Sequence, residues 1–78
     1  MNILFIYEKK YGVTAIFVDE YHYSPKEKLY TCYQHVGQHS ECTKEWLEGK
    51  KLATYNQYKD LLKELIEIGY EPDDLEVI

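Results

Sequence analysis

The chain has 78 residues, 45% of them hydrophobic, and a formal net charge of −5, which suits one small α+β domain, residues 1–78, with a modest core. Its nine tyrosines and nine lysines come with no arginine, so it lacks the side chain that most often reads phosphates and guanine edges. The acidic balance and the scattered lysines argue against direct binding to nucleic acid or to an anionic membrane, and they leave a basic protein as a partner.

The N-terminal segment, residues 1–7, is apolar but short. It lacks the basic residues and the small-residue cleavage site of a signal peptide, so it predicts a first strand. No run approaches the roughly 18 apolar residues of a membrane-spanning helix. We therefore expect a cytoplasmic protein, in which Cys32 and Cys42 are reduced.

Two apolar runs, residues 3–7 and 13–18, predict a β-hairpin. Their polar connection ends in Gly12, which can adopt the positive φ of a hairpin turn. Apolar residues occupy both faces of both runs. The two strands are therefore expected in the middle of a sheet, or covered on both sides.

A polar loop is expected over residues 19–28, although Tyr21 and Tyr23 can also extend the second strand, with His22 facing away from them. Residues 29–36 predict a third strand. Such a strand at the edge of the sheet can pair with a second copy of the chain, so a homodimer is one expectation.

Gly37 is expected to end the third strand. Residues 38–43 are polar and are interpreted as a turn. Ser40 or Thr43 can cap a short helical turn near residues 41–48.

Thr54 and Gln57 have the spacing of a capping box, which predicts the start of the main helix. Gly69, followed by Pro72, predicts its end. Between them lies an apolar stripe with helical spacing, made of Tyr55, Tyr58, Leu61, Leu62, Leu65 and Ile68. Residues 75–78 can add a final short strand. The elements together predict an α+β fold, a three- to four-stranded, mainly antiparallel sheet packed on one main C-terminal helix.

One arrangement resembles a metal site, namely Cys32-x2-His35-x3-His39-x2-Cys42. Two thiols and two imidazoles are a ligand set of tetrahedral zinc. The spacing is shorter than in zinc fingers, and residues three apart on a strand project to opposite faces. We therefore favour the alternative of a buried cysteine, an exposed histidine and a polar turn, and expect no cofactor.

No stretch has the spacing of a known catalytic motif. Cys42 with His35 or His39 is the one pair that suits a small hydrolase or transferase, but no Asn or Asp that orients the base is identifiable. The sequence therefore favours a binding role over an enzymatic one.

Tyrosine is common at protein interfaces, although in a small domain the same rings also cover a thin core. The acidic segments 19–20 and 71–74 are ordinarily solvated surface, but on one side of the molecule they can imitate a DNA backbone. The candidate interface residues are Tyr21, Tyr23, Gln38, His39, Trp46, Asp73 and Asp74.

The segment from Tyr30 to Tyr70 contains Gly37-Gln38-His39-Ser40 after a tyrosine-bearing strand and Leu65-Ile66-Glu67-Ile68-Gly69-Tyr70 at the helix end. It resembles small uncharacterised proteins encoded by bacteriophages and mobile elements of low-GC Gram-positive bacteria. The resemblance implies an accessory protein that acts on a host or phage protein. We expect a small acidic protein-interaction module, such as an inhibitor of a host defence or nucleic-acid enzyme. The alternative is a small-ligand or zinc-binding domain centred on residues 32–42.

Overall fold

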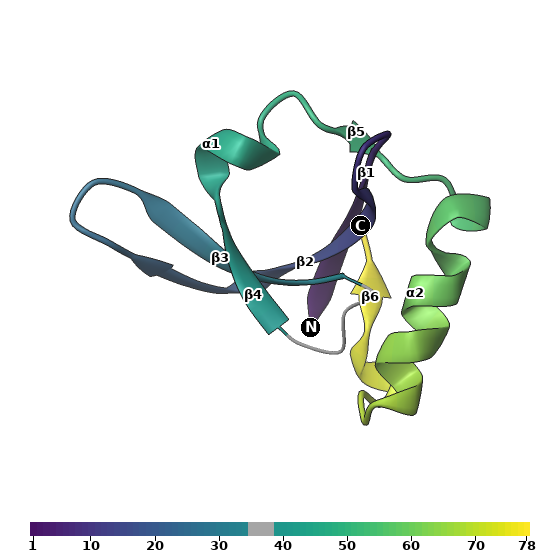
Figure 1. The fold of residues 1–78 in the computed structure, drawn as a ribbon. Helices are drawn as coiled ribbons and strands as arrows, with labels where there is room; N and C mark the ends of the chain where they lie inside the picture. The colour runs from purple at the N-terminus through teal and green to yellow at the C-terminus, as the bar shows by residue number, and fades with distance from the viewer. Residues whose placement is uncertain (35–38) are drawn as a thin grey trace.

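The chain folds into a strongly bent sheet with one long helix beside it, as the computed structural model shows for residues 1–34 and 39–78 (Figure 1). The strand order is β4-β3-β2-β1-β5, and β6 also pairs with β1. The α+β class and the mainly antiparallel sheet are confirmed, but the sheet has six strands rather than three or four. The elements are β1 (Asn2–Glu8), β2 (Gly12–Tyr23), β3 (Lys28–Tyr33), β4 (His39–Thr43), α1 (Lys44–Leu47), β5 (Lys51–Leu52), α2 (Tyr55–Glu67), the 3₁₀ helix η1 (Pro72–Asp74) and β6 (Glu76–Val77).

The predicted hairpin is confirmed. Strands β1 and β2 pair antiparallel from Ile3 opposite Phe17 to Glu8 opposite Gly12. Gly12 has a φ of 77°, a conformation that is costly for residues with a Cβ atom. Buried residues occur at successive positions of both strands, as expected for strands covered on both faces.

Strand β2 is longer than the apolar run because a β-bulge carries it on into the predicted loop. The pairing with β3 shifts between Phe17 and Tyr21, and it then continues with Tyr21 opposite Tyr30 and His22 opposite Leu29. Three residues of β2, 18–20, lie between these pairs and none of β3 does, and this odd number changes which residues face each side of the sheet. Tyr21 and Tyr23 therefore extend the strand, and His22 faces away from them, as the alternation predicted.

The interpretation of residues 38–43 as a turn is wrong for its described part. Residues 39–43 form β4, which pairs antiparallel with β3 from Tyr33 opposite His39 to Leu29 opposite Thr43. Strand β3 therefore lies between β2 and β4, so the edge that a second copy can meet is β4. Strand β3 ends at Tyr33 and Gln34 lies outside it, so the predicted third strand, residues 29–36, is too long in its described part. Its predicted end at Val36 and the break at Gly37 lie outside the described residues.

The short helical turn is confirmed as α1, and its N-cap is Thr43 rather than Ser40. The Thr43 hydroxyl accepts a hydrogen bond from the Trp46 backbone N–H at 3.0 Å. Ser40 is instead a member of β4. Gly49 follows the helix with a φ of 82° and turns the chain back toward β1.

Helix α2 begins and ends with the signals that the sequence contains. Thr54 and Gln57 form both hydrogen bonds of the capping box. At the other end, the N–H of Tyr70 bonds to the carbonyl of Leu65 and that of Gly69 to the carbonyl of Ile66, the two bonds of a Schellman motif.

The apolar stripe of α2 is narrower and shorter than predicted. Leu61 and Leu65 are fully buried, and Tyr58 and Leu62 pack against the same core. Tyr55 and Ile68 are not part of the contact, because their exposed fractions are 63% and 49%. Both stand at the ends of the helix, beyond the width of the sheet that α2 covers.

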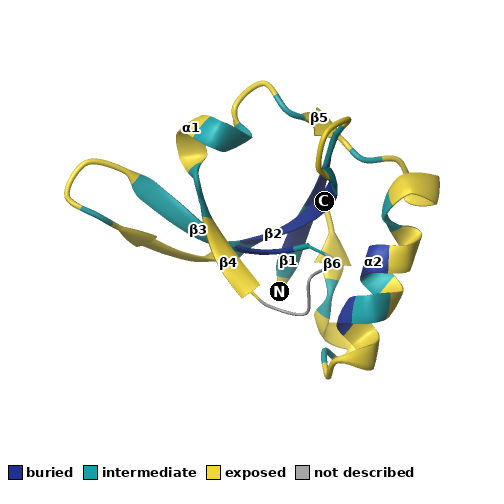
Figure 2. Cartoon of the chain, in the orientation of Figure 1, coloured by how far each residue is buried: buried dark blue, intermediate teal, exposed yellow. Residues whose placement is uncertain are grey.

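The core is divided by the sheet into two clusters, and buried residues are concentrated in β1, β2 and the middle of α2 (Figure 2). The cluster under α2 is built on Ile3, Phe5, Val13, Ala15, Phe17, Tyr33, Leu61 and Leu65. On the opposite face, Ile6, Ile16 and Cys32 are covered by a set that includes Trp46 and Leu47 of α1. Among the described residues, no helix is long and apolar enough to cross a membrane.

Two alanine substitutions on α2 test the narrower stripe. We expect Leu65→Ala to lower the free energy of unfolding by about 2–5 kcal/mol, because it leaves a cavity in the core. Ile68→Ala, the matched control, is expected to cost less than about 1 kcal/mol, because that side chain is half exposed. Urea unfolding followed by circular dichroism measures both, and equal losses would contradict the observed packing.

Candidate functional site

The predicted interface residues do not gather on one surface. Tyr21 and Tyr23 are exposed on the far part of the β2–β3 hairpin, which projects from the body of the molecule (Figure 1). Trp46 belongs to α1 and is half-buried against the sheet, and His39 lies at the start of β4. Asp73 and Asp74 belong to η1, and Gln38 lies outside the described residues.

The exposed hairpin tyrosines form a compact group with Lys28 and Tyr30, here named the tyrosine face. The register places Tyr21 opposite Tyr30 and Tyr23 opposite Lys28, so all four side chains project from one face. The Lys28 Nζ atom lies 3.9 Å from the ring centroid of Tyr21, 5.1 Å from that of Tyr30 and 5.8 Å from that of Tyr23. These are cation–π distances, so the ammonium group holds the rings in place.

Edge contacts between rings complete the group. Tyr21 meets Tyr23 and Tyr30 edge to face, with centroids 6.1 Å and 6.2 Å apart. The hydrogen bond to the Tyr30 hydroxyl raises the pKa of Lys28, which keeps the ammonium charged.

Lys28 and Tyr30 were not among the predicted interface residues. Their two-residue spacing in a strand is the signal that points to them, but only once the bulge in β2 is known.

His39 takes part in an aromatic contact between β4 and the end of α2. Its Nε2 atom lies 2.8 Å from the Tyr70 hydroxyl, and its ring is 5.1 Å from that of Tyr33 and 5.8 Å from that of Phe17. Burial, followed by the charge of Glu20, raises the pKa of Tyr70. This contact joins sheet to helix, which gives His39 a structural role.

The two cysteines lie on the other face of the sheet. Cys32 is opposite Ser40 in the β3–β4 register, and Cys42 is opposite Tyr30, so the four side chains share one face. The Cys32 Sγ atom is hydrogen-bonded to the Ser40 Oγ atom at 3.2 Å. A hydrogen bond from the Cys42 thiol, with a smaller contribution from Ser40, lowers the pKa of Cys32 to about 6. The same interaction raises the pKa of Cys42.

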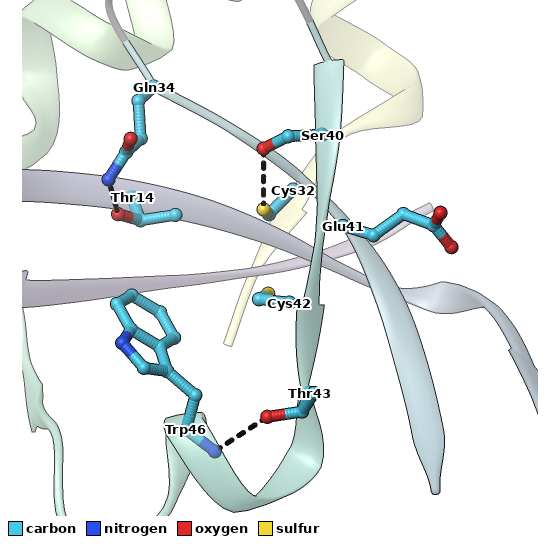
Figure 3. A pocket seen from close by; sticks show the side chains of 8 residues that line it. All are labelled: Thr14, Cys32, Gln34, Ser40, Glu41, Cys42, Thr43 and Trp46. Atoms are coloured by element: carbon cyan, nitrogen blue, oxygen red, sulfur yellow. Dashed lines mark hydrogen bonds between the residues drawn. The ribbon is translucent and has the colours of Figure 1, made fainter. Parts of the chain in front are cut away.

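These thiols border a pocket of about 320 Å³ between the sheet and α1, here named the thiol pocket. In Figure 3 the side chains of Cys32 and Cys42 lie on the same side of β4 as the indole of Trp46, and Glu41 points away. Gln34 donates a hydrogen bond of 2.7 Å to the Thr14 hydroxyl on the far wall. Among the described residues, the lining is Thr14, Cys32, Gln34, Ser40, Glu41, Cys42, Thr43 and Trp46.

The Trp46 wall of the thiol pocket is fixed from two sides. Its backbone is held by the Thr43 cap, and the Lys50 Nζ atom lies 4.7 Å from the centroid of its ring. The same ammonium group donates a 2.8 Å hydrogen bond to Glu8 on β1. Because cap, cation and carboxylate all act on one short helix, the indole has a defined position despite the four-residue length of α1.

The described zinc-ligand candidates do not converge. His39 is opposite Tyr33 in the register and projects into the α2 side, whereas Cys32 and Cys42 project to the α1 side. His35 lies outside the described residues. Over residues 1–34 and 39–78, no group of three or more Cys, His, Asp or Glu side chains is placed to hold a metal ion. For the same reason Cys42 and His39 cannot act as a nucleophile and its base, because the sheet separates them.

The acidic segments come together at one end of the molecule. The N-terminal ammonium group donates to the Asp74 carbonyl at 2.7 Å, and the Asn2 backbone N–H donates to the Asp19 carboxylate at 2.8 Å. Asn2 is also opposite Glu76 in the β1–β6 pairing. Residues 19–20 and 71–76 therefore flank the same first strand, and they make an acidic end next to the base of the hairpin.

Elemental analysis tests the metal geometry. We expect purified protein to hold less than about a tenth of an equivalent of zinc, because a structural site needs four converging ligands. His39→Ala is the matched variant, and it should not change the zinc content. Stoichiometric zinc that His39→Ala removes would contradict the separation of His39 from the thiols.

Comparisons with models of protein families, with curated proteins and with solved structures find no match for this chain. The resemblance to phage-encoded proteins therefore stays a prediction.

Proposed function

We propose that this chain is a protein-interaction module that binds its partner through the tyrosine face. The observation that carries the proposal is the group of rings around Lys28 on a projecting hairpin. Tyr21 and Tyr23 are 50% and 72% exposed, although neither ring is needed to cover the core. Clustered exposed rings of this kind mark interaction surfaces more often than they serve stability.

The fixed positions of the rings on the tyrosine face support a role in binding. Each ring is held by Lys28 or by an edge contact with a neighbouring ring, so little conformational freedom remains to be lost on association. Tyrosine combines a large apolar area with a hydroxyl that tolerates water, which suits a surface that is exposed before binding and buried afterwards. A partner surface with a shallow apolar pocket and hydrogen-bond acceptors fits this chemistry.

Charge favours a basic partner protein. The net charge of −5 and the acidic end, which begins at Asp19 and Glu20 beside the hairpin base, attract a positively charged surface over several ångströms. Such a surface is typical of nucleic-acid-binding proteins. Taken with the resemblance to phage-encoded proteins, this leads us to propose a host defence or nucleic-acid enzyme as the target, and inhibition as the effect.

A second candidate function is the binding of a small ligand, and the thiol pocket favours it. Its volume of about 320 Å³ is at the lower end of the range for ligand sites. The pocket combines one aromatic wall, Trp46, with hydroxyl, amide and thiol groups. We place this function second because small-molecule sites are usually lined by more than one large apolar side chain.

Affinity capture with paired variants tests the first function. The double variant Tyr21→Ser/Tyr23→Ser is expected to weaken binding of a captured partner by about thirtyfold, or about 2 kcal/mol, since exposed aromatic anchors dominate interface energies. Tyr55→Ser is the matched control, because Tyr55 is equally exposed but stands on α2. Binding constants for the wild type and both variants come from titration calorimetry with the partner identified by mass spectrometry.

The control variant and salt decide how the result is interpreted. Tyr55→Ser should retain wild-type affinity, and unchanged circular dichroism of the double variant excludes unfolding as the cause of a loss. The association rate should fall with added salt if the partner is basic. A partner whose affinity is equal for all three proteins would rule out the tyrosine face as the binding site.

A further inference from the structure

The thiol pair has an arrangement that packing alone does not require. The Cys32 Sγ atom is hydrogen-bonded to the Ser40 Oγ atom of the neighbouring strand at 3.2 Å. Cys42, whose thiol donates to the Tyr30 carbonyl at 3.9 Å, is the diagonal neighbour of Cys32 on the same strand as Ser40. The neighbour on the other side is Ile16 of β2, which is apolar. A hydroxyl that donates to the Cys32 sulfur atom stabilises its negatively charged form, which is the nucleophilic form of cysteine.

The same sulfur atom faces a space that a reagent can enter. Cys32 is only 4% exposed, yet it lines the thiol pocket together with Ser40 and Cys42. Burial of this degree admits small molecules and excludes bulky ones. A donor-stabilised thiolate at the wall of a small open pocket is the setting in which cysteines are modified selectively.

We propose that Cys32 is an oxidation site that reacts with hydrogen peroxide or another small hydroperoxide to give a sulfenic acid. The thiolate sulfur attacks the terminal oxygen of the peroxide, and the O–O bond breaks as the S–O bond forms. The sulfur takes the OH group and is oxidised. The departing hydroxide or alkoxide takes up the proton that the thiol released to solvent on ionisation, so the peroxide is reduced to water or an alcohol.

Electrostatics support this assignment and distinguish the two cysteines. The pKa of Cys32 is lowered to about 6, despite burial and the nearby Glu41 carboxylate, both of which act in the opposite direction. Interaction with Cys32, followed by burial, raises the pKa of Cys42. The directions of the two shifts favour ionisation of Cys32 over ionisation of Cys42.

The register of the strands bears on the fate of the product. Cys32 is opposite Ser40, so Cys42 is its diagonal neighbour on β4. Diagonal Cα atoms in an antiparallel pair are about 7–8 Å apart, beyond the usual limit of about 6.8 Å for a disulfide. Closure to a Cys32–Cys42 disulfide, with loss of water, therefore requires the strands to shift, and we expect the sulfenic acid to persist long enough to be trapped.

Peroxide treatment of the full chain followed by dimedone trapping tests the proposal. We expect the wild type to gain one dimedone adduct, which peptide mapping places on Cys32 and not on Cys42. Cys42→Ala and Ser40→Ala should slow the reaction, because each removes a donor to the thiolate. Cys32→Ser should abolish it, and circular dichroism shows whether that variant is folded.

A pH profile separates a stabilised thiolate from simple access to the sulfur. The rate of alkylation of Cys32 by iodoacetamide should be half-maximal near pH 6 in the wild type, in line with its pKa of about 6. In Cys42→Ala the midpoint should move toward 9.0, the ordinary pKa of a cysteine thiol, and the rate at pH 6 should fall by about tenfold.

The wild type and Cys42→Ala are enough to test the proposal, so the test does not depend on the folding of Cys32→Ser. An adduct on Cys32 of the wild type supports attack by this sulfur, and a Cys32–Cys42 disulfide in its place counts against a sulfenic acid held at Cys32. Modification that occurs first at Cys42 overturns the proposal, and so does a wild type that peroxide leaves unmodified. An alkylation midpoint that is the same in the wild type and in Cys42→Ala also overturns it, because Cys42 would then not stabilise the thiolate.

Discussion

The fold depends on the pairing of β1 with β2, which is buried on both sides. Residues that alternate along these strands, such as Phe5 and Ile6, belong to the two separate core clusters. Helix α2 covers one face of the hairpin and α1 covers the other. Each helix is therefore stabilised by its packing against the hairpin. Strand β1 also carries β5 and β6 on its outer edge. Loss of this one pairing would therefore remove the support of every other element.

The bulge in β2 determines which side chains the hairpin presents to the proposed partner. Before the bulge, β2 supplies both core clusters; after it, the same strand leaves the core and presents Tyr21 and Tyr23 on one face of the hairpin. Without the bulge, the register of the preceding pairs would place Val18 opposite Tyr30 and Glu20 opposite Lys28, in place of the two tyrosines. The bulge therefore sets which side chains a partner meets. It does so without changing the packing of the core, because the residues beyond it do not contribute to either cluster.

Local signals predicted the elements whose determinants lie within a few residues of each other. The turn at Gly12, the capping box at Thr54 and the C-terminal Gly69 are examples. Strand β4 could not be predicted, because His-Ser-Glu-Cys-Thr has no alternation of apolar residues, and its pairing with β3 holds it in place. The contact between Cys32 and Cys42 follows from that register. Sequence spacing suggested a metal site from the same residues, but it contained no information on which face each one occupies.

The outer edge of β1 is occupied by two short strands of the same chain. Strand β1, Asn-Ile-Leu-Phe-Ile-Tyr-Glu, has the composition of segments that assemble into fibrils when their backbone groups are unpaired. The short strands β5 and β6 occupy that edge, and the Ile78 N–H bonds to the Ile3 carbonyl at 3.0 Å. The few residues of the tail that pair with β1 therefore limit self-association. Proteolysis there would leave backbone groups of this buried, apolar strand unpaired and open to pairing with another chain.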